Sequence, residues 1–286
     1  MPSMQMLLFL EKYTLGSKII LGIFFAILLY MVIYFLVKTM EMAYVLKHKK
    51  PFYIHFYLFL RKLNSEQKGY LKNHFTFYNK LTLKQKKYFE HRVASFIVDK
   101  DFISRDGIVV TEKMKVLISA TGIMLTFGFR DFYIGLISKI IVYPTPFFSR
   151  STNNYHKGEF NPKLKTLVLS WEDFRLGFEN SHDNINLGIH EFTHAIHLNS
   201  IKERDISSTL FSDFFKELTD LLTYQEALRL KLLDSEYFRT YGYTNQFEFL
   251  AVIVENFIET PIEFRSQFPE VYSKVKQMLN FNFSGY

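Results

Sequence analysis

Cysteine is absent from this 286-residue chain, and glycine and proline are scarce, with 12 and 7 residues. The absence of cysteine excludes disulfides, thiolate zinc sites, iron–sulfur clusters and a cysteine nucleophile. It leaves the redox compartment open, because a chain without cysteine is compatible with any of them. Apolar residues make up 48% of the chain, which excludes a disordered or collagen-like protein. The length allows one or two folded domains.

Acidic residues are fewer than basic ones, 28 against 35, which gives a net charge of +7. Residues 1–50 hold six lysines and two glutamates and so carry +4, which leaves +3 for residues 51–286. Most of the excess therefore flanks a long apolar run, where it can contact anionic lipid. The lysines between Lys80 and Arg92 are interpreted as one solvated helix surface, so no nucleic-acid partner is predicted.

Residues 19–37 form an apolar run of 19 residues without a charge. As a helix with a rise of about 1.5 Å per residue, the run is roughly 28 Å long, close to the hydrocarbon thickness of a bilayer. A buried core helix is seldom this long and this free of polar residues, and a cleaved signal peptide has a shorter run and a small-residue cleavage site. We therefore predict a short tail over 1–17 and a permanent transmembrane anchor over 18–38.

Lysines are more numerous after this run than before it, and the positive-inside rule then places the large C-terminal part in the cytoplasm. Residues 39–60 are interpreted as a basic, aromatic juxtamembrane connector, and residues 61–286 as the functional domain. The lysines that set this orientation are Lys12 and Lys18 before the run and Lys38, Lys47, Lys49 and Lys50 after it.

The patterns after residue 60 predict a mostly helical α+β domain with a small sheet. Residues 116–129 are apolar, but they are too few for a second span and are interpreted as part of a core helix. Strands are predicted over 139–143, which Pro144 ends, and over 167–171. Helical spacing and candidate caps predict helices over 83–98, 112–126, 185–198, 212–233, 246–259 and 269–279.

The chemically informative motif is His190-Glu191-Phe-Thr-His194. The two histidines are four residues apart, so both imidazoles project from one face of a helix and can bind the same zinc ion. The Glu191 carboxylate can reach a water activated by that ion and act as a general base. The alternative is a hydrogen-bonded histidine pair without a metal, and a third ligand would decide between the two.

His197 is too far from His190 to be that ligand, roughly 10.5 Å along a regular helix, and it is interpreted as a packed or partly exposed helix residue. His182, in a polar loop, is predicted to lie at the surface. Glu248 and Glu255 are better candidates, because both interrupt an apolar helix, where a buried carboxylate needs a cation or hydrogen-bond donors. One would bind the metal and the other would orient a histidine. An exposed polar stripe remains the alternative for both.

Four segments, in the same order along the chain, resemble the Mlc titration factor A family of zinc metallopeptidases. That family is in turn similar to the lethal-factor toxin proteases, and the resemblance extends from about residue 60 to 280 without the apolar run. The segments are Ile141 to Phe147 (IVYPTPF), Leu167-Val168-Leu169-Ser170-Trp171, Asn186 four residues before His190, and Glu248 to Glu255 (EFLAVIVE).

The resemblance implies a zincin-like, gluzincin-like domain with one Zn²⁺ per chain, bound by His190, His194 and Glu248. It implies that Tyr241 donates to the oxyanion of the transition state, with Tyr243 as the local alternative. Glu255 and Asn186 are candidates for orienting the ligands. The strand Leu167–Trp171 is a candidate open edge on which an extended peptide substrate could pair.

The resulting hypothesis is a membrane-anchored zinc metallopeptidase that hydrolyses peptide or protein substrates. The alternative is a membrane-tethered regulatory module that binds a protein partner, such as a transcriptional regulator, with little or no catalysis. An intramembrane protease is disfavoured, because the motif lies about 150 residues beyond the apolar run, after the polar residues Asp183 and Asn184.

Overall fold

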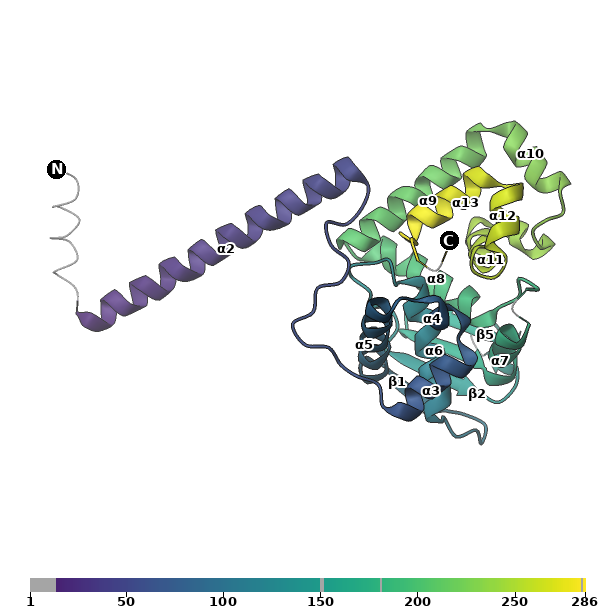
Figure 1. Ribbon diagram of the computed structural model, residues 1–286, viewed down its shortest axis with the longest axis horizontal. Helices are drawn as coiled ribbons and strands as arrows, with labels where there is room; N and C mark the ends of the chain where they lie inside the picture. Colours follow the sequence, from purple (N-terminus) through teal and green to yellow (C-terminus); the bar gives the residue numbers. More distant parts are fainter. Residues whose placement is uncertain (1–13, 150–151, 181, 284) are drawn as a thin grey trace. The chain divides into compact units, whose positions relative to one another are not determined.

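The computed structural model describes residues 14–149, 152–180, 182–283 and 285–286. The chain divides into two compact units, residues 1–52 and 53–286 (Figure 1). The predicted N-terminal tail over 1–17 falls largely outside the described residues, since these begin at Thr14.

The first unit contains the long apolar helix α2 (Leu15–His48). The Thr14 side chain caps its first turn, and Lys49 ends it in a left-handed conformation with φ 52°. At 34 residues the helix is roughly 51 Å long, more than a bilayer's hydrocarbon core requires. Its most apolar window has a mean hydropathy of 2.8 and is 0% buried, so α2 is long and apolar enough to cross a membrane and is not packed as a core helix.

A four-stranded mixed sheet lies in the second unit. Its order is β1 (Asp101–Ser104), β2 (Lys139–Tyr143), β6 (Thr166–Ser170) and β5 (Gly158–Asn161). β1, β2 and β6 are parallel, whereas β5 pairs antiparallel with β6. β2 has the bounds predicted from the sequence. A separate antiparallel pair consists of β3 (Phe147–Ser149) and β4 (Asn154–His156).

The strand predicted over 167–171 requires two corrections. Trp171 is not part of it but begins helix α7 (Trp171–Glu179), because the Ser170 hydroxyl caps this helix by accepting a hydrogen bond from the Asp173 N–H at 3.3 Å. The open edge predicted for this strand is also wrong. β6 lies between β2 and β5, which occupy the backbone groups on both of its sides. Among the described residues, β5 is the outer strand of this sheet at that end.

Helices dominate the second unit, as predicted. α11 (Gln246–Glu259) has the predicted bounds, but the helix predicted over 212–233 is two helices, α9 (Ile206–Tyr224) and α10 (Glu226–Asp234). The break falls at Gln225, whose ψ of 82° is not helical. The other helical segments are α3 (Ser65–His74), α4 (Thr76–Lys80), α5 (Leu83–Asp99), α6 (Glu112–Leu125), α8 (Leu187–Lys202), the 3₁₀ helix η1 (Thr240–Thr244), α12 (Pro261–Gln267) and α13 (Pro269–Met278).

Helix α8 is the centre of the domain. It contacts α6, α7 and the strands β5 and β6 on one side, and α9 and α11 on the other. Figure 1 shows the C-terminal helices α9 to α13 gathered on one side of α8 and the sheet on the other. Side chains on α8 therefore face both a strand of the sheet and the N-terminal turn of α11, which is the arrangement that builds the site.

Residues 53–60, predicted to belong to a connector, pack as part of the second unit. The cause is Arg92 on α5, whose side chain is fully buried. Its guanidinium donates to the Tyr57 hydroxyl at 2.5 Å and to the Ile54 carbonyl at 3.0 Å. Because a buried guanidinium must have its donors satisfied, this segment is tied to the domain before residue 61.

Candidate active site

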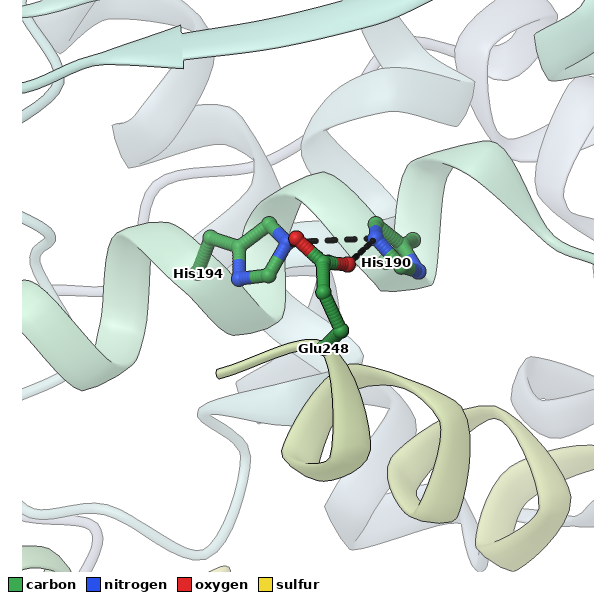
Figure 2. Close-up of side chains that lie close together, drawn as sticks. All are labelled: His190, His194 and Glu248. Atoms are coloured by element: carbon green, nitrogen blue, oxygen red, sulfur yellow. Dashed lines mark hydrogen bonds and ion pairs between the residues drawn. The ribbon is translucent and has the colours of Figure 1, made fainter. Parts of the chain in front are cut away.

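His190, His194 and Glu248 bring one ligand atom each to a common point (Figure 2). The two histidines project from α8, and Glu248 reaches them from the first turn of α11. The Glu248 Oε2 atom lies 3.0 Å from His190 Nε2 and 3.5 Å from His194 Nε2, and the two Nε2 atoms are 3.1 Å apart. Two segments separated by more than fifty residues therefore converge on one set of nitrogen and oxygen donors.

These separations fit a metal ion. A tetrahedral zinc ion with ligand bonds of about 2.0–2.1 Å holds neighbouring ligand atoms about 3.3–3.4 Å apart, close to the distances found here. Two imidazoles and one carboxylate form the donor set of a catalytic zinc centre, which keeps its fourth position open. The residues present thus fit a bound divalent metal in both chemistry and spacing.

The charges around His190 also favour a cation. Burial lowers the pKa of its imidazole, but hydrogen bonds to Glu248 and Glu255 outweigh burial and raise this pKa to about 9. For Glu248, burial raises the pKa, and the hydrogen bonds from the two histidines outweigh it and lower the pKa below its usual range. A site in which two carboxylates surround one imidazole stabilises positive charge, whether a proton or a metal ion supplies it.

Asn186 fixes the start of α8. Its side-chain oxygen accepts the Ile189 N–H at 3.1 Å, and its amide donates to the Gly177 carbonyl at 2.8 Å and to Glu259 at 3.1 Å. The sequence suggested that Asn186 orients a ligand. In the structure it instead caps the helix that carries both histidines, so its influence on them runs through the backbone.

Glu248 owes its position to the start of α11. The Asn245 side chain caps this helix and accepts the N–H groups of Phe247 and Glu248 at 2.9 and 3.0 Å. A carboxylate in the first turn also interacts favourably with the helix dipole. The N-terminal end of α11 is therefore both the anchor of Glu248 and the element that carries it to α8.

Glu255, two turns further along α11, contacts the other nitrogen of His190. Its Oε1 lies 2.7 Å from His190 Nδ1, and its side chain is 1% exposed. The second carboxylate oxygen of Glu255 forms an ion pair with Arg239. Sequence reasoning missed Arg239, because no spacing relates a residue just before η1 to the histidine motif.

Glu191 is buried beside the outer strand β5. Burial raises the pKa of its carboxyl group. A Cβ atom added to Gly158 would lie 2.7 Å from both Cγ and Oε1 of Glu191, so only glycine lets the strand come this close. The sequence offered no signal for this contact, since Gly158 stands outside any recognised motif.

The structure separates the two candidate tyrosines. The Tyr241 ring lies 6.1 Å from the His190 ring, and burial, followed by the charge of Glu248, raises its pKa to about 12. The Tyr243 hydroxyl instead donates to the Leu232 carbonyl at 2.9 Å. Tyr241 is therefore the tyrosine that faces the site, and it stays protonated near neutral pH.

A cleft of about 510 Å³ opens beside His190 of the metal-binding group. This volume accommodates several residues of an extended peptide, and the cleft is lined by residues of β4, the start of β5, α7, α8 and the start of η1. The lining residues that bear on the chemistry are Tyr155, Gly158, His190, Glu191, Arg239 and Tyr241.

His197 and His182, the other histidines near the motif, lie in the core and at the surface respectively. His197 is 3% exposed and packs against the rings of Phe215 and Phe247, with centroids 4.2 and 5.1 Å away. Burial lowers its pKa to about 4, so it is a neutral core residue, which is the packed rather than the partly exposed of the two predicted alternatives. His182 is exposed in the turn before α8, also as predicted.

A histidine pair on one helix, a carboxylate from a second helix and an open cleft define a metal site of the kind that metallopeptidases use. Residues 57–280 match the family described as glucose-regulated metallo-peptidase M90, and the chain belongs to this family. It is also similar to the uncharacterized protein slr2042 of Synechocystis sp., with 25% identity over 239 residues that cover 77% of this chain and 85% of the relative. The family indicates peptidase activity and a bound metal.

Proposed function

We propose that this protein is a zinc-dependent peptidase that hydrolyses peptide bonds in the cleft before α8. The convergence of His190, His194 and Glu248 beside a buried glutamate carries the proposal, because it joins the donor set of a catalytic zinc centre to a candidate general base. An ion bound there would lower the pKa of water and polarise the scissile carbonyl. The three donor residues supply an imidazole–carboxylate site that would hold it.

Glu191 is the proposed general base. It takes a proton from the attacking water and returns it to the amine of the departing peptide. Its burial raises its pKa, which favours a carboxylate that must accept a proton. The close approach of Gly158 limits where the Glu191 side chain can move.

Tyr241 and β5 are proposed to act on the substrate. Tyr241 lines the cleft next to His190 and would donate its hydroxyl proton to the oxygen that becomes negative in the transition state. The outer edge of β5, rather than β6, is the edge on which an extended peptide could pair its backbone. Because Gly158, at the start of β5, approaches Glu191 closely, a peptide paired there would lie near the proposed base.

The helix α2 is proposed to anchor the protein in a membrane, with the peptidase domain on the cytoplasmic side. Its length and apolar composition support the anchor, and the four lysines that follow residue 37 support the orientation. The domain that carries the site lies outside the span, so its substrates would be peptides or proteins in the aqueous phase.

The decisive experiment measures the metal content and the peptidase activity of the purified full chain and of three variants. Glu191→Gln should retain one zinc per chain and lose hydrolysis, since it removes the base and keeps the ligands. Glu248→Ala should lose the zinc. Glu255→Ala should keep most of it but bind it more weakly. Unchanged peptidase activity in Glu191→Gln would refute the assignment.

A further inference from the structure

Exposed aromatic and aliphatic side chains line the segment that follows α2. Phe56, Leu58 and Phe59, all in the second unit, are 72%, 82% and 89% exposed, and we refer to these three residues as the juxtamembrane patch. Neighbouring large apolar side chains at such exposure mark an interaction surface rather than scattered surface residues.

The residues that alternate with the patch residues in the sequence contact the domain and so determine which way the patch faces. The His55 ring stacks on Tyr88 with centroids 4.6 Å apart, and the Tyr57 hydroxyl accepts from Arg92 at 2.5 Å. These residues face the domain, whereas the high exposure of Phe56, Leu58 and Phe59 shows that their side chains point to solvent. The structure thus holds an irregular segment in place with its apolar side outward.

The charges beside the patch are all of one sign. Between residues 47 and 62 the chain has five lysines and arginines and neither aspartate nor glutamate. Aromatic residues next to lysine and arginine are typical of segments that lie at the interface of an anionic bilayer. The basic residues are Lys47, Lys49, Lys50, Arg61 and Lys62.

The length of the chain allows this segment to reach the membrane surface. α2 continues for eleven residues beyond Val37, which is roughly 16 Å past the apolar run. The eight residues 49–56 can extend over as much as about 28 Å. Phe56 can therefore return to the headgroup layer if residues 19–37 cross the bilayer.

We propose that the juxtamembrane patch inserts into the interface of an anionic bilayer and gives the domain a second membrane contact besides α2. The aromatic and leucine side chains enter the headgroup boundary, and the flanking lysines and arginines pair with lipid phosphates. Because Ile54, His55 and Tyr57 fix the segment to the domain, this contact limits the orientations that the peptidase domain adopts at the membrane. The inference rests on the proposed membrane anchor.

The single tryptophan, Trp171, makes a direct test possible. In a Trp171→Phe background, a Phe59→Trp probe is introduced in the full chain, which is reconstituted into vesicles of phosphatidylcholine and phosphatidylglycerol with brominated acyl chains. Bromine quenches only a nearby indole. We expect the Phe59→Trp emission to be blue-shifted and strongly quenched, and the quenching to weaken in vesicles of phosphatidylcholine alone.

Two further probes separate the possible outcomes. Tyr224→Trp, at an 83% exposed position at the end of α9, should remain unquenched, and Phe25→Trp, within α2, should be quenched if α2 crosses the bilayer. Quenching at Phe25→Trp with none at Phe59→Trp would contradict the proposed membrane contact of the patch and leave the proposed anchor intact. No quenching at Phe25→Trp overturns the anchor itself. A blue shift at Phe59→Trp without bromine quenching shows that protein, such as a second copy, covers the patch, and it also overturns the proposal.

Discussion

The Nδ1 atom of His190 lies 2.7 Å from Oε1 of Glu255, while Nε2 of the same ring faces Glu248 at 3.0 Å. One imidazole is thus held by two carboxylates of the same helix, one at each nitrogen. The Nδ1 contact fixes the orientation and tautomer of the ring so that Nε2 is free to bind a metal. Glu255 is itself held by Arg239, so two residues in succession support the His190 ring from behind.

Replacing Arg239 by methionine should weaken metal binding by about 10- to 100-fold, the usual cost of losing a residue that orients a ligand. The physical reason is that Glu255 is 1% exposed and would lose the cation that balances its charge. The dissociation constant for zinc, measured by competition with a chelator, checks this expectation. Arg239→Lys should restore part of the affinity.

Arg229→Met is the matched control for that variant. Arg229 is half exposed and lies 3.9 Å from Glu226 on α10, so its loss should leave zinc affinity unchanged. Equal affinities for Arg239→Met and the unmodified protein would show that Arg239 does not support the site.

Replacing Gly158 by alanine should lower kcat by about tenfold or more while the zinc content stays at one per chain. The added Cβ would lie 2.7 Å from Glu191 and would displace its carboxylate from the cleft floor. Gly69→Ala serves as the control, because nothing lies within 4 Å of its added Cβ. Metal analysis and steady-state kinetics on the same preparations distinguish a displaced base from a lost metal.

Tyr241→Phe should reduce kcat by about 10²- to 10³-fold with little change in KM, as expected for a donor that acts mainly in the transition state. Tyr243→Phe should leave kcat unchanged, because its hydroxyl donates to the Leu232 carbonyl instead of facing the cleft. The reverse pattern in these kinetic measurements would reassign the oxyanion donor to Tyr243.

Glu259 should make the stability of the domain fall as the pH rises. Burial raises the pKa of its carboxyl to about 7 from an unfolded value near 4.5, and its Oε2 is buried without a partner. Between these values the folded state binds more protons than the unfolded state, so its stability declines through this window and the loss is complete above pH 7. The expected loss is at most about 3 kcal/mol.

Glu259→Gln tests this dependence, because glutamine can still accept the hydrogen bond from Asn186 but cannot ionise. Denaturant unfolding of the full chain should show the variant to be more stable than the unmodified protein at pH 8. The two should be nearly equal at pH 4.5. If the difference in stability between the variant and the unmodified protein does not change with pH, the pH dependence does not arise from ionisation of Glu259.

Local patterns in the sequence predicted the features that depend on neighbouring residues. The four-residue spacing of His190 and His194 is enough to place them on one helix face. The bounds of α11 and β2 follow from their apolar periodicity and from the residues that end them. The exclusion of His197 as a ligand also depended only on helix geometry.

Features that depend on two distant segments were decided by the tertiary structure alone. Glu248 and Glu255 share a helix and an apolar setting, and only the packing of α11 against α8 places Glu248 at the histidine pair and Glu255 behind His190. Backbone pairing made β5 the outer strand instead of β6. The ion pair of Arg239 and the approach of Gly158 to Glu191 arise in the same way. Sequence patterns reflect the local requirements of a single helix or strand. Which residues of different elements contact one another is determined by how the helices and strands pack in the folded protein.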